Sequence, residues 1–307
     1  MEEELHISDI LPKDWLDKSG KGSIYVSSYH CLTDILKRKQ KWYLTGRILN
    51  TTFLLIDTTL EYLKCEMFFK ELVEFIPQFE LISQDKKTEQ SSILFLFMQN
   101  DLESKTLAEL QSARGLLSNI EGKNTNYWHI TDYILHFPEG NKTFISPSIK
   151  PPDPCPAFLT EIIVDSVSEK ISSLELELQS RIKLALRWVD SSEHETNGID
   201  EFLKLWFAIE TISMPNSTDI KPLVSRLAKI YQLEPKKANN YLGVGRICGL
   251  RSNIVHNGHI TGIHQQLIVY LKSIFNDTLL DICGLANNKR ALHVLDDSTF
   301  DKATWLP

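Results

Sequence analysis

PSIKPPDPCP, residues 147–156, divides the chain into two regions with different sequence patterns. Five prolines in ten residues prevent a continuous helix, because proline lacks a backbone N–H and clashes with the preceding turn. We therefore predict a linker over 147–156, since a chain of 307 residues is long enough for two domains. The predicted domains are a first domain over 1–146 and a second over 157–290, followed by a C-terminal tail over 291–307.

The first domain is predicted to be mixed α/β. A short apolar run at 92–98 is bounded by polar residues, as is typical of a buried strand. Further strands are expected over 43–52 and 128–137, and helices over 60–76 and 107–120. The histidines and acidic residues of this domain show no metal-ligand pattern, and no phosphate-binding loop is present.

The second domain is predicted to be all-helical. Apolar residues recur at helical spacing, and short polar loops separate the helices. A helical bundle is therefore the expected architecture, and the fold class is α+β overall. The expected helices cover 172–189, 201–212 with Asp200 as N-cap, 222–231, 241–256 and 263–283.

The overall composition is that of a globular protein, with 42% hydrophobic and 24% charged residues. Five cysteines are scattered without a Cys-x-x-Cys pair, so we predict no zinc site, no redox motif and no cofactor. An odd number of cysteines without a spacing pattern favours a reducing compartment. The acidic N-terminus lacks a signal-peptide pattern, and no apolar run is long enough to cross a membrane. A cytoplasmic location without a membrane partner is expected.

The charge distribution is uneven along the chain. The net charge is −7, but residues 204–272 contain nine Lys/Arg and three Asp/Glu, a local balance of +6 against −13 elsewhere. Local potential rather than net charge governs attraction to phosphate groups. The basic segment is therefore compatible with an RNA partner, although an uneven solvated surface would give the same count.

An arginine and a histidine lie within this basic segment, in Arg251-Ser-Asn-Ile-Val-His256-Asn-Gly258. Arginine is a fixed cation suited to phosphate oxygens, and histidine titrates near neutral pH. Such a pair fits cleavage of RNA without a metal ion, because RNA supplies the nucleophile, its 2′-hydroxyl group. Arg251 would stabilise the phosphate, and His256 would act as acid or base. Ser252 would lie in the groove, and Asn253 or Asn257 can orient the phosphate or the imidazole.

The helical positions of the two side chains constrain this site. At 100° per residue, Arg251 and His256 lie about 140° apart around the helix. They can converge on one phosphate when a second wall closes the groove, and a second copy of the helix would supply that wall. The alternative is structural: Arg251 lies along the bundle surface, His256 is a polar residue in the last turn, and Gly258 is the C-cap.

The string Leu250–Gly258 resembles the R-x(4–6)-H signature of HEPN domains, specifically the ApeA-like branch. Two upstream segments, 200–210 (DEFLKLWFAIE) and 225–228 (SRLA), resemble helices of that branch in the same order. The likeness covers roughly 172–285. One departure is Asn257, because the branch often has glycine directly after the histidine and here Gly258 is displaced by one.

The resemblance implies a helical bundle that dimerises and pairs two R-x(4–6)-H motifs in one cleft. Many such domains are metal-independent endoribonucleases of toxin–antitoxin, CRISPR or anti-phage systems. Arg251 and His256 would be catalytic, and Glu210 and Arg226 would be supporting residues, with Glu210 in the structural role of pairing with a basic residue such as Arg226 across the bundle. A protein antitoxin or regulatory partner is then expected, and the N-terminal domain would sense a trigger or restrain the nuclease.

Two other functions remain open from the sequence. One is a non-catalytic HEPN scaffold that binds RNA, a nucleotide or a protein. The other is an interaction protein without a nucleic-acid role, in which the basic segment meets an acidic partner or the chain's own acidic N-terminal half.

Overall fold

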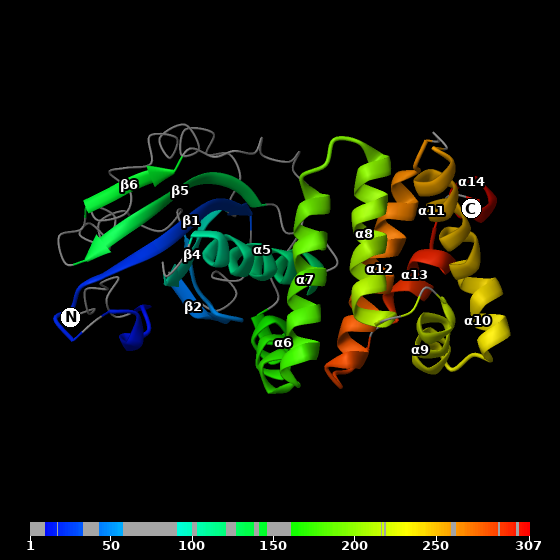
Figure 1. Ribbon diagram of the computed structural model, residues 1–307, viewed down its shortest axis with the longest axis horizontal. Helices are drawn as coiled ribbons and strands as arrows, with labels where there is room; N and C mark the ends of the chain where they lie inside the picture. Colours follow the sequence, from blue (N-terminus) through cyan, green and yellow to red (C-terminus); the bar gives the residue numbers. More distant parts are fainter. Residues whose placement is uncertain are drawn as a thin grey trace. The chain divides into compact units, whose positions relative to one another are not determined.

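A computed structural model describes the protein over residues 10–16, 18–32, 43–57, 91–99, 103–120, 127–137, 141–145, 161–215, 217, 219–258, 262–287, 289–298 and 301–307. The fold class is α+β, as the sequence predicts (Figure 1). The chain forms two compact units, one of Met1–Ala113 and Lys123–Asp165, the other of Arg114–Gly122 and Ser166–Pro307. The predicted linker over 147–156 and the predicted helix over 60–76 lie outside the described residues.

The first unit contains a six-stranded sheet in which every neighbouring pair of strands is antiparallel. The strand order is β2-β3-β4-β1-β5-β6. The strands are β1 (Gly22–Leu32), β2 (Tyr43–Ile48), β3 (Thr51–Asp57), β4 (Ser91–Gln99), β5 (Tyr127–Phe137) and β6 (Asn141–Ile145).

The core of the sheet lies around β1, β3 and β4. Val26 of β1 faces Phe97 of β4 on one side and Tyr133 of β5 on the other, and all three are buried. The short 3-10 helix η1 (Lys13–Trp15) adds Trp15 to the same cluster. Residues 93–98 of β4 are buried on both faces of the sheet, which explains why this strand is a continuous apolar run rather than an alternating one.

The structure confirms the predicted strands at 92–98 and 128–137, and corrects the one at 43–52. That segment ends at Ile48, where Leu49 turns with φ of 55°, and β3 then continues to Asp57 as the second strand of a hairpin. The predicted helix over 107–120 is confirmed as α5 (Glu103–Ile120).

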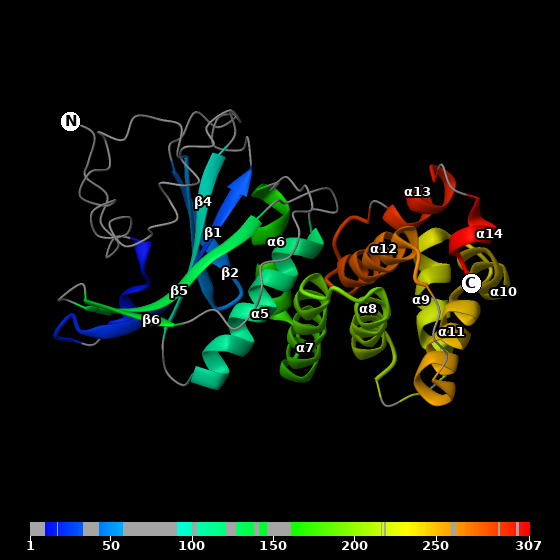
Figure 2. The ribbon, with the colours of Figure 1, turned by 90° about the horizontal axis from the view of Figure 1, so that it is seen from above.

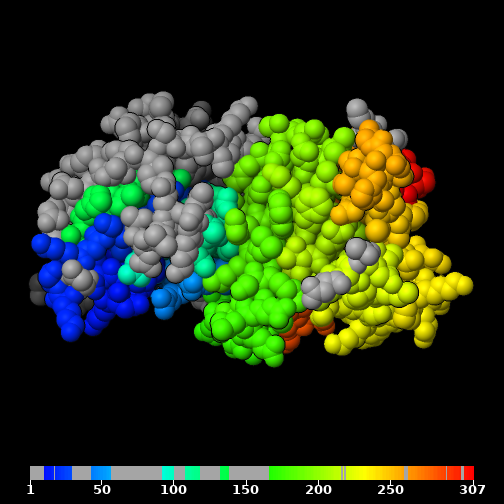
Figure 3. Space-filling view, in the orientation of Figure 1, coloured from blue at the N-terminus to red at the C-terminus, as the bar shows by residue number. Residues whose placement is uncertain are grey.

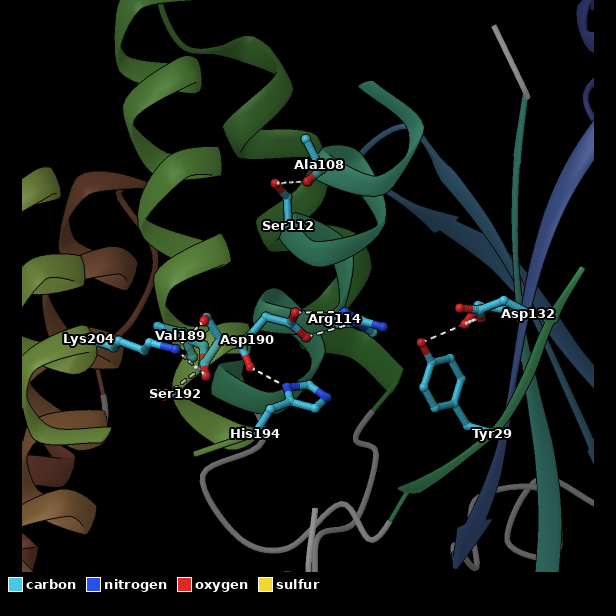
Figure 4. Close-up of polar contacts among 12 residues, drawn as sticks. Tyr29, Ala108, Ser112, Arg114, Asp132, Val189, Asp190, Ser192, His194 and Lys204 are labelled. Atoms are coloured by element: carbon cyan, nitrogen blue, oxygen red, sulfur yellow. Dashed lines mark hydrogen bonds and ion pairs between the residues drawn. The ribbon is translucent and has the colours of Figure 1, made fainter. Parts of the chain in front are cut away.

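The division between the two units falls within α5, after Ala113. Arg114 is buried and donates two hydrogen bonds of 2.8 Å to the carboxylate of buried Asp190 in α7 (Figure 4). At the next residue, a Cβ on Gly115 would come within 1.9 Å of the Leu186 carbonyl oxygen of α7. The helical unit therefore includes Arg114–Gly122 of the N-terminal half, and the rest of it runs over Ser166–Pro307, whereas the predicted second domain covered 157–290.

The second unit is helical, as predicted. Helix α8 packs against both α7 and α12, and Figures 1 and 2 show the three helices side by side. The helices are α6 (Glu161–Ser173), α7 (Leu176–Glu193), α8 (Gly198–Ser213), α9 (Lys221–Tyr231), α10 (Pro235–Leu242), α11 (Val244–Asn257), α12 (Gln265–Ile282), α13 (Arg290–Asp296) and α14 (Lys302–Trp305).

Three helix boundaries differ from the prediction. The expected helix over 172–189 is interrupted at 174–175, between α6 and α7. Asp200 is not the N-cap of α8, because Asn197 accepts the hydrogen bond from the Ile199 N–H at 3.0 Å and the helix begins three residues earlier than predicted. The expected helix over 241–256 breaks at Gly243, whose φ of 67° ends α10.

The expected tail over 291–307 contains α13 and α14, and both contact α12. Fully buried Asp277 of α12 fixes the start of α13, because its carboxylate accepts hydrogen bonds from the Arg290 and Ala291 N–H groups and from the Tyr231 hydroxyl. Among the described residues, no helix has both the length and the apolar character needed to span a membrane.

Candidate functional site

The candidate site lies in the second half of α11, which begins after Gly243 and ends at Gly258. Gly258 adopts a left-handed conformation with φ of 61°, and its N–H bonds to the Asn253 carbonyl, as in a typical C-cap. Ile247 is fully buried, but Ile254 is only half-buried. The last two turns of α11 therefore lie at the edge of the helical unit.

Arg251 is held against α8. Its Nη2 atom lies 3.6 Å from Oε2 of Glu210, and its guanidinium lies 5.8 Å from the ring centroid of Phe207. The side chain is 25% exposed. Its Nε atom is buried and has no hydrogen-bond partner. The cation is thus positioned by an ion pair and an aromatic ring, with one buried N–H left without a hydrogen-bond partner.

Glu210 pairs with a basic residue, as predicted, but that residue is Arg251 and not Arg226. The second oxygen of Glu210, Oε1, accepts a hydrogen bond of 2.7 Å from Trp206 Nε1, one turn earlier on α8. Arg226 instead pairs with Asp281 of α12, at 2.6 Å. Glu210 therefore orients Arg251 directly, whereas Arg226 fastens α9 to α12 and lies outside the candidate site.

His256 is exposed in the last turn of α11. It makes no hydrogen bond or ion pair with any other residue that the structure describes. Its imidazole is therefore accessible to a ligand, while Arg251 leans toward α8. Within one copy of α11, no hydrogen bond joins Arg251 to His256.

The other predicted residues surround this pair in different ways. Ser252 is half-buried, whereas Asn253 and Asn257 are exposed. The Asn257 side chain donates a hydrogen bond of 3.2 Å to Asn253 Oδ1, one turn away. Both amides lie at the solvent edge next to His256, where they can contact a ligand.

Two aromatic residues near Arg251 were not predicted as part of the site. Phe207 contacts Arg251, and Trp188 of α7 packs edge-to-face against Phe207 with 5.6 Å between the ring centroids. Both rings are half-buried. The available signal was the i, i+3 spacing of Phe207 and Glu210, which places them on one side of α8.

The pKa of the Cys248 thiol is influenced by Glu210 and Arg251. Burial raises the pKa of its thiol above the ordinary value of 9.0, the Glu210 carboxylate raises it further, and Arg251 lowers it. A thiol with a raised pKa is a poor nucleophile near neutral pH. Cys248 is therefore a neighbour of the site and not a nucleophile.

No group of three or more His, Cys, Asp or Glu side chains is arranged to hold a metal ion in the part of the chain that the structure describes. Comparisons with protein-family models, with curated proteins and with solved structures give no match to this chain. The chemistry of the site therefore has to be argued from its own residues.

Proposed function

We propose that this chain is a metal-independent endoribonuclease of the HEPN type, with Arg251 and His256 as its catalytic residues. The observation that carries the proposal is the contrast between them. Arg251 is positioned by Glu210 and Phe207 and stays 25% exposed, while His256 is exposed without a partner among the described residues. A positioned cation and an accessible imidazole match the needs of phosphoryl transfer in RNA.

In the proposed reaction, the 2′-oxygen of a ribose attacks the adjacent phosphorus and the bond from phosphorus to the 5′-oxygen breaks. The products are a 2′,3′-cyclic phosphate and a 5′-hydroxyl. The 2′-hydroxyl must lose a proton and the leaving 5′-oxygen must gain one, and imidazole is suited to both transfers near neutral pH. Arg251 stabilises the additional negative charge on the phosphorane with its guanidinium cation.

A homodimer completes the proposed site. Two copies of α11 across a two-fold axis would place two His256 side chains in one cleft, so that one accepts a proton and the other donates one. Val255, next to His256, is 44% exposed and offers an apolar contact for such an interface. We further propose that the activity serves anti-phage defence or a toxin-like system, held in check by the N-terminal unit or by a protein antitoxin.

A non-catalytic RNA-binding scaffold is the second candidate. Glu210 already offers Arg251 a negative charge at 3.6 Å, which weakens its attraction for a phosphate. This candidate predicts RNA binding that weakens with salt and no cleavage products under any condition.

The test is cleavage of a mixed RNA pool in EDTA by the native chain and by Arg251→Ala and His256→Ala. The expected result is cleavage by the native chain and a loss of at least about a hundredfold in each variant, since general acid–base catalysis contributes on that order. His293→Ala is the matched control, because it removes an exposed histidine from α13. Cleavage that survives in His256→Ala contradicts the proposal.

A further inference from the structure

We propose that the exposed side of α11, marked by Arg246, Gly249, Asn253 and His256, binds the phosphate backbone of a single RNA strand, together with Lys236 and Lys237 of α10. We call these six residues the α10–α11 stripe. The inference rests on the proposed RNA substrate and adds a surface that holds the strand beyond the Arg251/His256 pair.

The sequence around the stripe is almost free of negative charge. Between residues 220 and 276 there are eight Lys/Arg and a single acidic residue, Glu234, in a chain whose net charge is −7. Such a concentration of one sign creates a local potential that attracts a polyanion.

Most of these cations are already neutralised within the helical unit. Lys221 pairs with Asp219, and Arg226 and Lys229 pair with Asp281. Arg251 pairs with Glu210, and Lys272 pairs with Glu193 and Glu201. Three remain exposed without an ion pair among the residues that the structure describes, namely Lys236, Lys237 and Arg246.

The four α11 residues of the stripe form one continuous line. At 100° per residue they fall within an arc of about 80°, and the rise from Arg246 to His256 is about 15 Å. All four are exposed. The line therefore leads from Arg246, which has no ion pair among the described residues, to His256. A single line of residues suits one phosphate backbone rather than the two backbones of a duplex.

Helix α10 packs beside the start of α11. The Asn239 side chain accepts a hydrogen bond of 2.9 Å from the Gly245 N–H, which holds the middle of α10 against the first turn of α11. Lys236 and Lys237 are exposed on α10. Figure 3 shows α10, in yellow, and the end of α11, in orange, both at the surface of the helical unit on the face in view.

Gly249 provides an open position in the middle of the stripe. A Cβ added there would meet no atom within 4 Å, so the position takes a new side chain without a clash. A glycine at the surface also lets a strand approach the helix backbone closely. The position is therefore suited to placing a charge of either sign directly under the bound strand.

The experiment measures binding of the full chain to a single-stranded 2′-O-methyl RNA, which lacks the attacking hydroxyl and is not cleaved. Each phosphate contact on a single strand adds about 0.7 to the slope with which log K falls as log salt concentration rises. At 0.1 M salt, one such contact makes the binding constant about fivefold larger. We expect Arg246→Ala to bind about fivefold more weakly and to lower the salt slope by about 0.7. Gly249→Glu is expected to weaken binding by at least as much, and Gly249→Lys to strengthen it.

Two further variants separate the causes. Gly249→Ala distinguishes the effect of a methyl group from that of a charge, and thermal unfolding checks that each variant is folded. Leu176→Glu adds the same negative charge at a residue of α7 that is 80% exposed and outside the stripe. The inference is overturned if Gly249→Glu binds as tightly as Leu176→Glu, or if the native chain does not bind the RNA.

Cleavage of unmodified RNA distinguishes this inference from the proposed function. Binding that depends on the stripe, without cleavage, supports the inference and removes the nuclease. If cleavage depends on His256 but binding is unchanged by substitutions at Arg246 and Gly249, the inference is overturned and the proposed nuclease function is retained.

Discussion

Arg251 owes its position to two residues of α8. Glu210 attracts the guanidinium at 3.6 Å, and Phe207 offers its ring at 5.8 Å. Trp206 fixes the Glu210 carboxylate in turn, through a hydrogen bond of 2.7 Å. These contacts restrict the side-chain conformations of Arg251 before any ligand is present. The proposed binding of a phosphate would therefore lose less side-chain entropy.

The thiol of Cys248 gives a direct test of this arrangement. Burial and Glu210 raise its pKa, so we expect alkylation at pH 7.5 to be slower than that of an unperturbed cysteine. Glu210→Gln removes one raising influence and should speed the reaction, whereas Arg251→Ala removes the lowering influence and should slow it. Mass spectrometry of the Cys248 peptide measures the rates, and equal rates in the two variants contradict the arrangement.

The sequence identifies the candidate residues but not their partners. Arg251 and His256 are recognisable from the R-x4-H spacing and the charge of the segment. Arg226 as the basic partner of Glu210 was wrong, because Arg226 pairs with Asp281, which lies 55 residues away along the chain, and Glu210 pairs with Arg251. Which carboxylate faces which cation depends on how α8, α9 and α12 pack, and local spacing carries no information on that packing.

At the scale of elements, two helical glycines are expected to respond oppositely to the same substitution. Gly115→Ala places a Cβ within 1.9 Å of the Leu186 carbonyl oxygen, so α5 must move away from α7. We expect a loss of about 1–3 kcal/mol in the free energy of unfolding. Gly249→Ala meets no atom within 4 Å and should gain about 0.5–1 kcal/mol, since alanine favours a helix.

Urea unfolding of the two alanine variants measures both effects. A Gly115→Ala protein as stable as the native chain would show that α5 and α7 do not meet at this residue.

Asp277 is expected to decide whether α13 stays folded onto α12. Asp277→Ala leaves the Tyr231 hydroxyl and the Arg290 and Ala291 N–H groups without their acceptor. Because unsatisfied buried donors cost about 1–3 kcal/mol each, we expect a loss of about 3 kcal/mol in the free energy of unfolding. Hydrogen exchange of the α13 amides should increase first.

The pH dependence of Asp277 has a defined sign. Burial raises its pKa above the ordinary value of 3.8, so the folded state holds the proton more tightly than the unfolded state. Its contribution to stability is therefore full below the unfolded pKa and is lost as pH rises through the folded pKa. The native chain should lose stability relative to Asp277→Asn as pH rises from about 4, and the opposite trend would contradict a raised pKa.

Helices and strands with a clear apolar pattern were predictable from the sequence, but the residues at which they begin and end were less so. β4 was visible as an apolar run, but β1 was missed because its sequence, GSIYVSSYHCL, mixes serines with apolar residues. Ser27 and Ser28 are nevertheless buried, and Ser27 is hydrogen-bonded to Tyr29 and to Asp132 of β5. The breaks before α7 and after α10 were missed because apolar spacing continues across them.

At the scale of the whole molecule, the helical unit depends on a segment of the N-terminal half. Asp190 is buried in α7 and finds its counter-charge in Arg114. A fragment of residues 153–307 removes Arg114 and leaves a buried carboxylate unpaired, which costs about 3–5 kcal/mol. We expect this fragment to unfold at a lower temperature than the intact chain, and Asp190→Asn to recover part of the loss.

Thermal unfolding of the fragment, with and without Asp190→Asn, tests this dependence. If removal of residues 1–152 lowers the unfolding temperature equally with and without Asp190→Asn, loss of the Arg114–Asp190 pair is not the reason for the lower stability of the fragment.

The measurement that tests the central claim most directly is the chemical form of the RNA ends produced in EDTA by the native chain and by His256→Ala. Our account predicts fragments that end in 2′,3′-cyclic phosphate from the native chain, because the 2′-hydroxyl is the nucleophile, and none from His256→Ala. Fragments with other ends, or cyclic-phosphate ends that persist in His256→Ala, would contradict the assignment of the Arg251/His256 pair as a ribonuclease site.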